Sequence, residues 1–458
     1  MTHTKTLALA LLASTLVSGS AVFVQASATQ AIEVSARTTL RHVPKAVHVS
    51  NDDASLTRVA LRLQKRIEQR FNQQPTLASL RSAISVRRAL LSRSVSIVFQ
   101  DEATSADIST WQVSLNRYPE WISFSLRGSP RFELDTNVIE QHIAEHAPDG
   151  LQAPSFARII ETKQDRSIVR ATVDGRVADG QSYDADRVLA AIVQAYEKNI
   201  DAVTVPVQHI RGAVLYDDGT TTHVLHEMGS GRSEFASSPW GRKQNVRKAM
   251  NEKANGIIVA SNETFSYNAT LGGPITKSNG WFDSLIIVNG RDLEPAPGGG
   301  ICQSATTVFR AAVAAGMPIV TRKSHSLYVH YYKEFGMGLD ATVFPGSQDM
   351  VFLNDTPGPL VLLGMTDEHD NAYSTLYGVD DKRVVTMEGP FFGYTHTEPV
   401  MGRTLRSGEV AWIQHVQKHD GTTRDQLLVS QYRGLPRSVA LEFEPILHGA
   451  ADLVADGR

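Results

Sequence analysis

The single cysteine of the chain, Cys302, lies in the segment PAPGGGICQSATTVFRAAVAAG and is the residue best placed for nucleophilic chemistry. A thiol becomes a strong nucleophile when it ionises, and unpaired backbone N–H groups at a helix start stabilise the thiolate. Three glycines precede the cysteine, and because glycine has no Cβ, both backbone and substrate can approach the sulfur closely. We therefore predict covalent catalysis by Cys302 at the start of a buried helix, which Gly316 and Pro318 end.

A cysteine nucleophile needs a base, and His325 is the first candidate, 23 residues further on in RKSHSLYVHYY. Asp340, in the segment GLDATV, can orient an imidazole, and Gln303 can donate a hydrogen bond to a developing oxyanion. Catalytic Cys/His pairs are adjacent in space and not in sequence, so this spacing permits the pair without being diagnostic of it.

A structural interpretation of the same residues stays open beside the catalytic one. Most unpaired cysteines are small buried hydrophobic residues, and Cys302 at a glycine-rich bend fits that description. His325 can equally be a satisfied structural histidine. We interpret His330, which alternates with Tyr328 and Tyr332 along one predicted strand, as mainly structural.

The composition of the chain excludes several kinds of site and argues against one class of partner. One cysteine in 458 residues excludes intrachain disulfides and a zinc site built from several thiolates, so core packing must hold the protein together. With 45 Lys and Arg against 48 Asp and Glu, the net charge of -3 argues against a nucleic-acid partner. We predict no cofactor and no metal ion.

The N-terminus resembles an export signal. Thr6 to Val24 is mostly apolar, and Ala26-Ser27-Ala28 has the small-residue pattern of a signal-peptidase site, which predicts a signal peptide over residues 1–28 and an extracytoplasmic, wall- or surface-associated protein. The alternative is an uncleaved membrane anchor, although serine and threonine residues dilute the apolar run. Contact with a membrane is expected only in that case.

The elements that must position these residues form an α+β chain with three parts after the signal segment. Alternating strand-like runs and amphipathic helices predict an α+β domain over 37–207, and the cysteine helix is the centre of a mixed α/β domain over 229–378. Residues 386–458 are predicted to be a β extension with a hairpin turn at Asp420-Gly421. The expected helices are Leu56–Phe71, Asp135–His146, Tyr183–Tyr196 and Arg242–Ala254.

The motifs GGGICQSATT, RKSHS and GLDATV, in this order, resemble the VanW family of bacterial cell-envelope proteins, which was first noted beside glycopeptide-resistance genes. The resemblance covers roughly 229–378 and includes the ETFSYN and FPGSQDMVFLNDT segments. The preceding region is more weakly similar to the peptidoglycan-binding-like domain that often precedes VanW. The chain departs from the family pattern at Ala305 and at Ser261-Asn262, and neither change touches the predicted nucleophile or base.

The resemblance implies an L,D-transpeptidase-like enzyme that acts on peptidoglycan through a thioester intermediate. Its partners would be the stem peptides and the glycan of the wall. The family cysteine falls on Cys302 and the family histidine on His325, with Asp340 as the predicted third catalytic residue. The Ser-His-Gly-Cys motif of the better-known L,D-transpeptidases is absent. The residues predicted to contact the substrate or the oxyanion are Gly299, Gly300, Gln303 and Ser326.

Two competing functions stay open. The segment His142-Ile143-Ala144-Glu145-His146 matches the H-x-x-E-H signature of zinc peptidases, on a predicted helix that stops directly after the second histidine. A non-catalytic protein that binds peptidoglycan is the rival from another class, and tryptophans in such a protein can stack on sugars although they more often lie in the core. The candidates for stacking are Trp111, Trp121 and Trp281.

Overall fold

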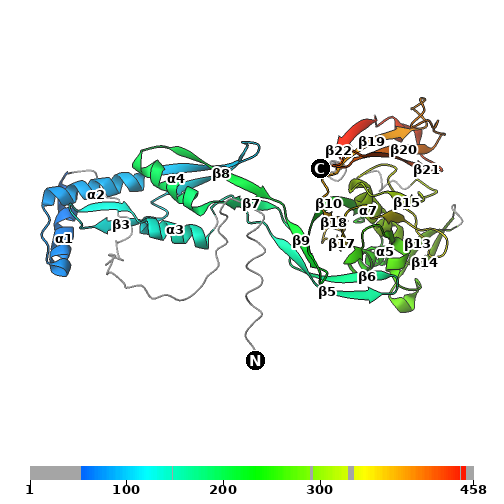
Figure 1. Cartoon of the computed structure of the whole chain (residues 1–458), viewed down its shortest axis with the longest axis horizontal. Helices are drawn as coiled ribbons and strands as arrows, with labels where there is room; N and C mark the ends of the chain where they lie inside the picture. The colour runs from blue at the N-terminus through cyan, green and yellow to red at the C-terminus, as the bar shows by residue number, and fades with distance from the viewer. Residues whose placement is uncertain (1–52, 147, 289–291, 329–334, 444, 450–458) are drawn as a thin grey trace. The chain divides into compact units, whose positions relative to one another are not determined.

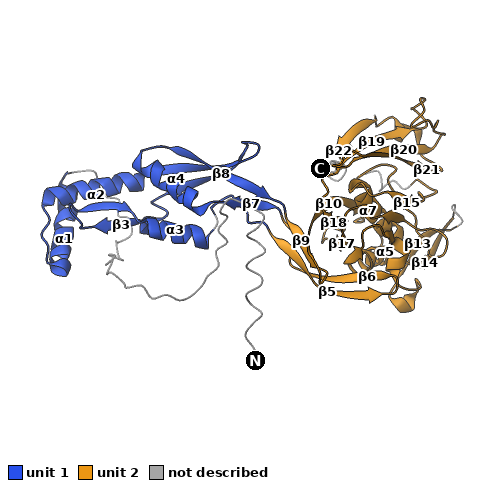
Figure 2. Ribbon diagram, viewed as in Figure 1, with its two compact units in different colours: residues 1–154, 179–211 blue, residues 155–178, 212–458 orange. Residues whose placement is uncertain are grey.

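The computed structural model describes residues 53–146, 148–288, 292–328, 335–443 and 445–449 and has the predicted α+β character (Figure 1). The chain divides into two compact units (Figure 2). Unit 1 holds the residues up to 154 together with 179–211, and unit 2 holds 155–178 together with 212–458. The predicted signal peptide, 1–28, lies outside the described residues, and the predicted domain borders stay predictions. Within the described part of the chain, no helix is long and apolar enough to span a bilayer.

The described part of unit 1 contains a four-stranded sheet in the order β2-β1-β8-β7, a small β3-β4 hairpin and four α-helices. Three of these helices match predicted ones within a few residues, and α2 was not predicted. The elements are α1 (Asp53–Phe71), α2 (Leu77–Ser92), β1 (Ser94–Asp101), β2 (Asp107–Ser114), β3 (Ile122–Ser125), β4 (Arg131–Leu134), α3 (Thr136–Glu145), β7 (Gly180–Tyr183), α4 (Ala185–Glu197) and β8 (Ala202–Ile210).

Three tryptophans considered for sugar stacking lie in hydrophobic cores. Trp111 and Trp121 are 2% and 0% exposed in unit 1, and Trp281 is 3% exposed in unit 2. Because a stacking ring must be open to its ligand, the interpretation of these three residues as sugar platforms is wrong.

The H-x-x-E-H segment lies on α3, with His146 as the residue that caps its C-terminus. The His142 ring packs edge-on against Tyr118 and Trp121, at centroid distances of 5.1 and 5.2 Å. Burial lowers the pKa of His142, aided by the nearby His146. The described residues contain no group of three or more histidine, cysteine or carboxylate side chains arranged to hold a metal ion. Within this part of the chain, the zinc-peptidase interpretation therefore has no set of metal ligands to support it.

Unit 2 is built on a closed barrel with the strand order β10-β18-β17-β11-β6-β5-β9. Helix α7 (Ile301–Ala314) packs against β10 and β18. Glycines allow this close approach, since a Cβ at Gly229 would lie 2.3 Å from the Ala315 nitrogen and one at Gly231 would lie 2.2 Å from the Thr307 oxygen. The barrel strands are β5 (Phe156–Asp165), β6 (Ile168–Asp174), β9 (Ala213–Asp217), β10 (Thr222–Glu234), β11 (Ile257–Val259), β17 (Leu360–Thr366) and β18 (Asn371–Val379).

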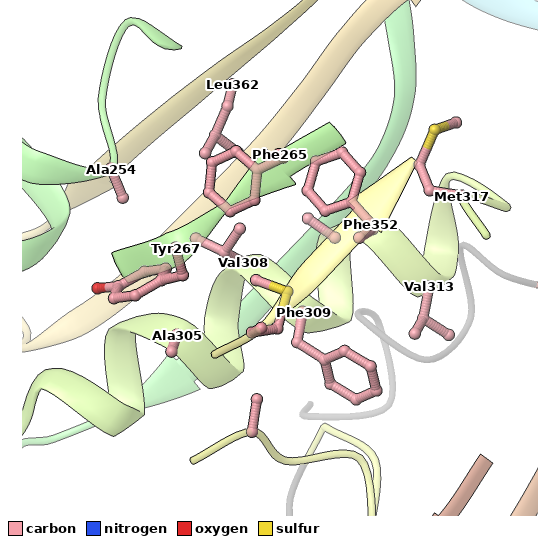
Figure 3. Packing of buried hydrophobic residues seen from close by; sticks show 14 of the residues in the cluster. Ala254, Phe265, Tyr267, Ala305, Val308, Phe309, Val313, Met317, Phe352 and Leu362 are labelled. Carbon is pink, nitrogen blue, oxygen red and sulfur yellow. The ribbon is translucent and has the colours of Figure 1, made fainter. Parts of the chain in front are cut away.

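The buried side chains around α7 form the main hydrophobic core of unit 2 (Figure 3). Val308, Phe309 and Val313 of the helix pack there with Phe265 and Phe352 of other segments (Figure 3). The remaining elements of this region are α5 (Trp240–Lys248) with a π-helical turn at Ala249–Lys253, β12 (Thr264–Ser266), α6 (Tyr267–Leu271), β13 (Asp283–Val288), β14 (Asp292–Pro297), α7 (Ile301–Ala314), β15 (Ile319–Thr321) and β16 (Val351–Leu353).

The C-terminal segment of unit 2 folds into a four-stranded sheet in the order β21-β20-β19-β22, and Asp420-Gly421 forms the predicted hairpin turn. This sheet shares the main core, to which it contributes Met387, Trp412 and Leu428. Its elements are β19 (Val384–Phe392), β20 (Glu409–Gln417), β21 (Thr423–Gln431), α8 (Arg437–Ala440) and β22 (Ile446–Gly449).

Candidate active site

Cys302 is the second residue of α7, as the sequence predicted, and is half-buried against the main core. Gly300 is the N-cap residue, with a φ of +117°, a conformation that L side chains rarely adopt. The Cys302 Sγ lies 3.5 Å from the carbonyl oxygen of Val343. The helix start therefore presents the sulfur toward the loop that follows Asp340.

A buried amide that the sequence analysis missed holds the glycine turn in place. The Asn245 Nδ2 donates to the carbonyl oxygens of Gly299 at 2.9 Å and Phe282 at 2.8 Å, and its Oδ1 accepts from the Phe282 N–H at 2.9 Å. Asn245 is 0% exposed. Asn245 lies in the polar helix α5, whose sequence has no apolar periodicity from which the burial of Asn245 could be predicted. Because all three bonds join residues distant in sequence, only the fold shows that Asn245 supports the site.

Two glycines of the turn serve the packing of the chain. A Cβ at Gly299 would lie 2.7 Å from the Ser284 oxygen of β13, so this turn and that strand are in direct backbone contact. A Cβ at Gly300 would lie 3.1 Å from side-chain atoms of Arg242 and Val246 on α5. The turn before Cys302 is therefore fixed between β13 and α5.

The structure brings Cys302, His325 and Asp340 together. The His325 Nδ1 is hydrogen-bonded to the Asp340 Oδ2, which also accepts from the His325 backbone N–H at 2.8 Å. The side chains of His325 and Cys302 are hydrogen-bonded. With Nδ1 held by the carboxylate, Nε2 is the ring nitrogen left to face the sulfur. Residues far apart in the sequence thus form a Cys–His–Asp chain. His330 lies outside the described residues.

The electrostatics of this chain favour a thiolate and an imidazolium. Burial raises the pKa of Cys302, but the hydrogen bond to His325 and its positive charge outweigh burial, so the pKa lies below its ordinary value. Burial lowers the pKa of His325, yet its hydrogen bonds to Asp340 and Cys302 raise the pKa to about 10. The pKa of Asp340 is lowered against its own burial by His325 and by the Arg322 charge. Both shifts favour the thiolate–imidazolium form of the Cys302–His325 pair over the neutral form.

The far side of Asp340 is bound by two residues that the sequence analysis missed. The Tyr432 hydroxyl donates to the Asp340 Oδ1, and the Arg322 Nη2 lies 3.6 Å from the same oxygen. Arg322 is fixed in turn by bonds to the backbone oxygens of Asp340 and Gly338 at 2.6 and 2.8 Å. Burial raises the pKa of Tyr432, so its hydroxyl stays protonated and remains a donor. Both partners of the carboxylate are long-range contacts.

Two predicted substrate residues have partners of their own. The Gln303 side chain is 0% exposed, accepts from Arg242 at 2.6 Å and donates to the Glu234 oxygen at 2.7 Å. It therefore ties α7 to α5 and β10. Ser326 is half-buried, and its carbonyl oxygen accepts from the Arg433 N–H at 2.8 Å, which holds the loop with His325 against the end of β21.

Comparisons with known proteins match the region of the chain in which this candidate site lies. Residues 241–376, which include the glycine turn and all three members of the Cys–His–Asp chain, match the family model described as VanW like protein. The chain is 34% identical over 169 residues to the Uncharacterized protein YoaR of Bacillus subtilis (strain 168). That match covers 36% of this chain and 53% of YoaR, so the chain spans about half the length of this relative. No solved structure matches the chain significantly.

Proposed function

The chain belongs to the VanW family through its residues 241–376, and from this premise we propose that it is an exported cell-wall enzyme that transfers acyl groups through Cys302. The substrate class is the peptidoglycan stem peptide, and the reaction resembles that of an L,D-transpeptidase. The Cys302–His325–Asp340 chain is the observation that carries this proposal, because a cysteine hydrogen-bonded to an imidazole that a carboxylate orients is the arrangement of an activated nucleophile.

In the first half-reaction, the Cys302 thiolate attacks the carbonyl carbon of an amide between an L-configured centre and a terminal D-residue. The carbonyl π electrons move to oxygen and form a tetrahedral oxyanion. When this intermediate collapses, the C–N bond breaks and the leaving amine takes the proton held by the His325 imidazolium. The products of this step are a thioester on Cys302 and a free D-amino acid.

The start of α7 supplies one backbone N–H group that suits the oxyanion. The N–H groups of Ile301 and Gln303 donate to the oxygens of Gly298 and Gly300 at 3.1 and 3.0 Å. The N–H of Cys302 lies between these two groups, and the described residues supply no backbone acceptor for it. Because the Gln303 side chain is bonded to Arg242 and Glu234, we assign the oxyanion to the backbone N–H of Cys302 at the helix start.

In the second half-reaction, an amine of a neighbouring stem peptide attacks the thioester carbonyl. His325 accepts the proton that this amine loses, the C–S bond breaks, and the thiolate is restored next to the imidazolium. The new amide is a cross-link between two stem peptides. Water as the acceptor gives a trimmed stem peptide, so the same site supports carboxypeptidase activity.

Intact-mass measurement tests the acyl enzyme directly. Purified protein mixed with a stem peptide that ends in a D-residue should gain the mass of the acyl group, and Cys302→Ser and His325→Asn should not gain it on the same time scale. The chain has one cysteine, so a thioester can form only at Cys302. A wild-type protein that sediments with cell wall and never acquires the acyl mass would refute the enzyme and favour a binding protein.

A further inference from the structure

One tryptophan of this protein is open to solvent. All five tryptophans lie in the described part of the chain, and four of them are at most 3% exposed. Trp240 is 64% exposed, and it is the first residue of α5. The ring of Phe282, itself 40% exposed, meets the Trp240 ring edge-on at a centroid distance of 4.7 Å. The two rings form an aromatic corner on the surface of unit 2.

This aromatic corner adjoins the turn that precedes Cys302. A Cβ at Gly241, next to Trp240, would lie 3.4 Å from the Phe282 Cβ, so the start of α5 rests directly on the Phe282 segment. The Phe282 carbonyl oxygen accepts from the Gly298 N–H at 3.1 Å and from Asn245. Backbone and side-chain bonds thus connect the corner to the glycine turn that precedes Cys302.

The neighbours of the aromatic corner are polar. Asp283, directly after Phe282, forms an exposed ion pair with Lys277 at 2.5 Å. The Ser238 hydroxyl, two residues before Trp240, accepts from Arg242 at 3.0 Å. Two rings with such a rim provide far less area than a stable protein interface needs. They suit a small amphipathic group, with an apolar C–H face for the electron-rich faces of the rings and hydroxyl groups for the charged rim.

A sugar ring has this chemistry. We propose that Trp240 and Phe282 bind a sugar of the glycan strand whose stem peptide reacts at Cys302. This inference rests on the proposed function, because it gives the same enzyme a preference for stem peptides that are still attached to glycan. The corner is a binding element that acts on affinity, since the Cys302–His325–Asp340 chain is complete without it.

Fluorescence tests the sugar site without turnover. In a Cys302→Ala variant, a peptide-free glycan fragment of peptidoglycan should change the tryptophan emission, because the one exposed tryptophan lies at the site. Trp240→Phe should lose this change while its unfolding midpoint stays the same. No change with the glycan fragment, or a change with phospholipid vesicles alone, would overturn the proposal.

Kinetics separates this site from the acyl-transfer chemistry. For stem peptides attached to glycan, Trp240→Ala should raise KM by about 3- to 10-fold and leave kcat unchanged, as expected for the loss of one aromatic stacking contact. Free stem peptides should react equally well with both proteins. Phe156→Ala, which changes a 41% exposed phenylalanine on β5, is the matched control and should alter neither substrate. Equal loss on both substrates would overturn the sugar site and leave the proposed acyl transfer intact.

Discussion

Replacing Tyr432 by phenylalanine removes a single hydroxyl from the buried charge chain and tests the account of the thiolate. This hydroxyl donates to the Asp340 Oδ1, while His325 occupies the Oδ2. Asp340 is 1% exposed, so water cannot readily replace the lost donor. Phenylalanine keeps the ring that packs beside Tyr328 and in the surrounding core, so the change is confined to one hydrogen bond.

A hydrogen bond to a buried charged group contributes about 1.5–3 kcal/mol. Its loss should raise the pKa of Asp340, because the bond favours the ionised carboxylate. Once Asp340 is protonated, His325 loses the anion that raises its own pKa, and the imidazolium no longer stabilises the Cys302 thiolate. The pH at which the Cys302 thiolate forms, on the acidic side of the pH profile, should therefore move to a higher value.

The rate of alkylation by iodoacetamide as a function of pH measures this titration. With one cysteine in the chain, every alkylation event reports on Cys302. Tyr373→Phe is a matched control, because it removes a tyrosine hydroxyl that donates to Asp367 at 3.1 Å elsewhere in unit 2. A Tyr432→Phe profile that coincides with those of the wild type and the control would refute the reasoning.

Two further substitutions probe other parts of the site. Asp340→Asn keeps the size of the side chain and removes the charge that raises the pKa of His325, so alkylation of Cys302 at neutral pH should slow by at least about 10-fold. Asp367→Asn is the control for this substitution. An unchanged alkylation rate in Asp340→Asn would contradict the role assigned to Asp340. Asn245→Ala leaves buried backbone groups of Phe282 and Gly299 without their partner and should lower the free energy of unfolding by about 1–3 kcal/mol, measured by urea denaturation. Asn251→Ala removes an exposed amide from the neighbouring π-helical turn and should have little effect; equal losses in the two variants would argue against a special role for Asn245.

Local signals in the sequence were sufficient to place Cys302 at the start of a helix. The three glycines and the apolar run after them predicted the helix that begins beside Cys302, and the structure confirms it. The helix on which Asn245 lies was also predicted, although the structure ends its regular part at Lys248 and continues it as a π-helical turn. These features depend on residues close in sequence, whose conformational preferences act before any tertiary contact is made.

The partners of the site could not be predicted in the same way. Tyr432 contacts Asp340 from 92 positions away in the chain, and no spacing rule connects an aromatic residue near a strand end with a distant aspartate. Gln303 shows the converse problem. Its type and position suited an oxyanion donor, but the fold buries its amide against Arg242 and Glu234. A residue's chemistry can be read from its type, whereas the direction of its side chain depends on tertiary packing.

The C-terminal sheet is part of the site, although it lies beyond the residues that match the family model. The Trp412 indole donates to the Met337 oxygen at 2.7 Å, and the Gln414 amide donates to the Val313 oxygen of α7 at 2.7 Å. Tyr432, which directly follows the last residue of β21, donates a hydrogen bond to the Asp340 Oδ1, the carboxylate oxygen that His325 does not use. Since the carboxylate orients the imidazole and the imidazole stabilises the thiolate, the reactivity of Cys302 depends on a segment that begins after residue 376. The residues that support the proposed site therefore extend beyond the matched residues 241–376.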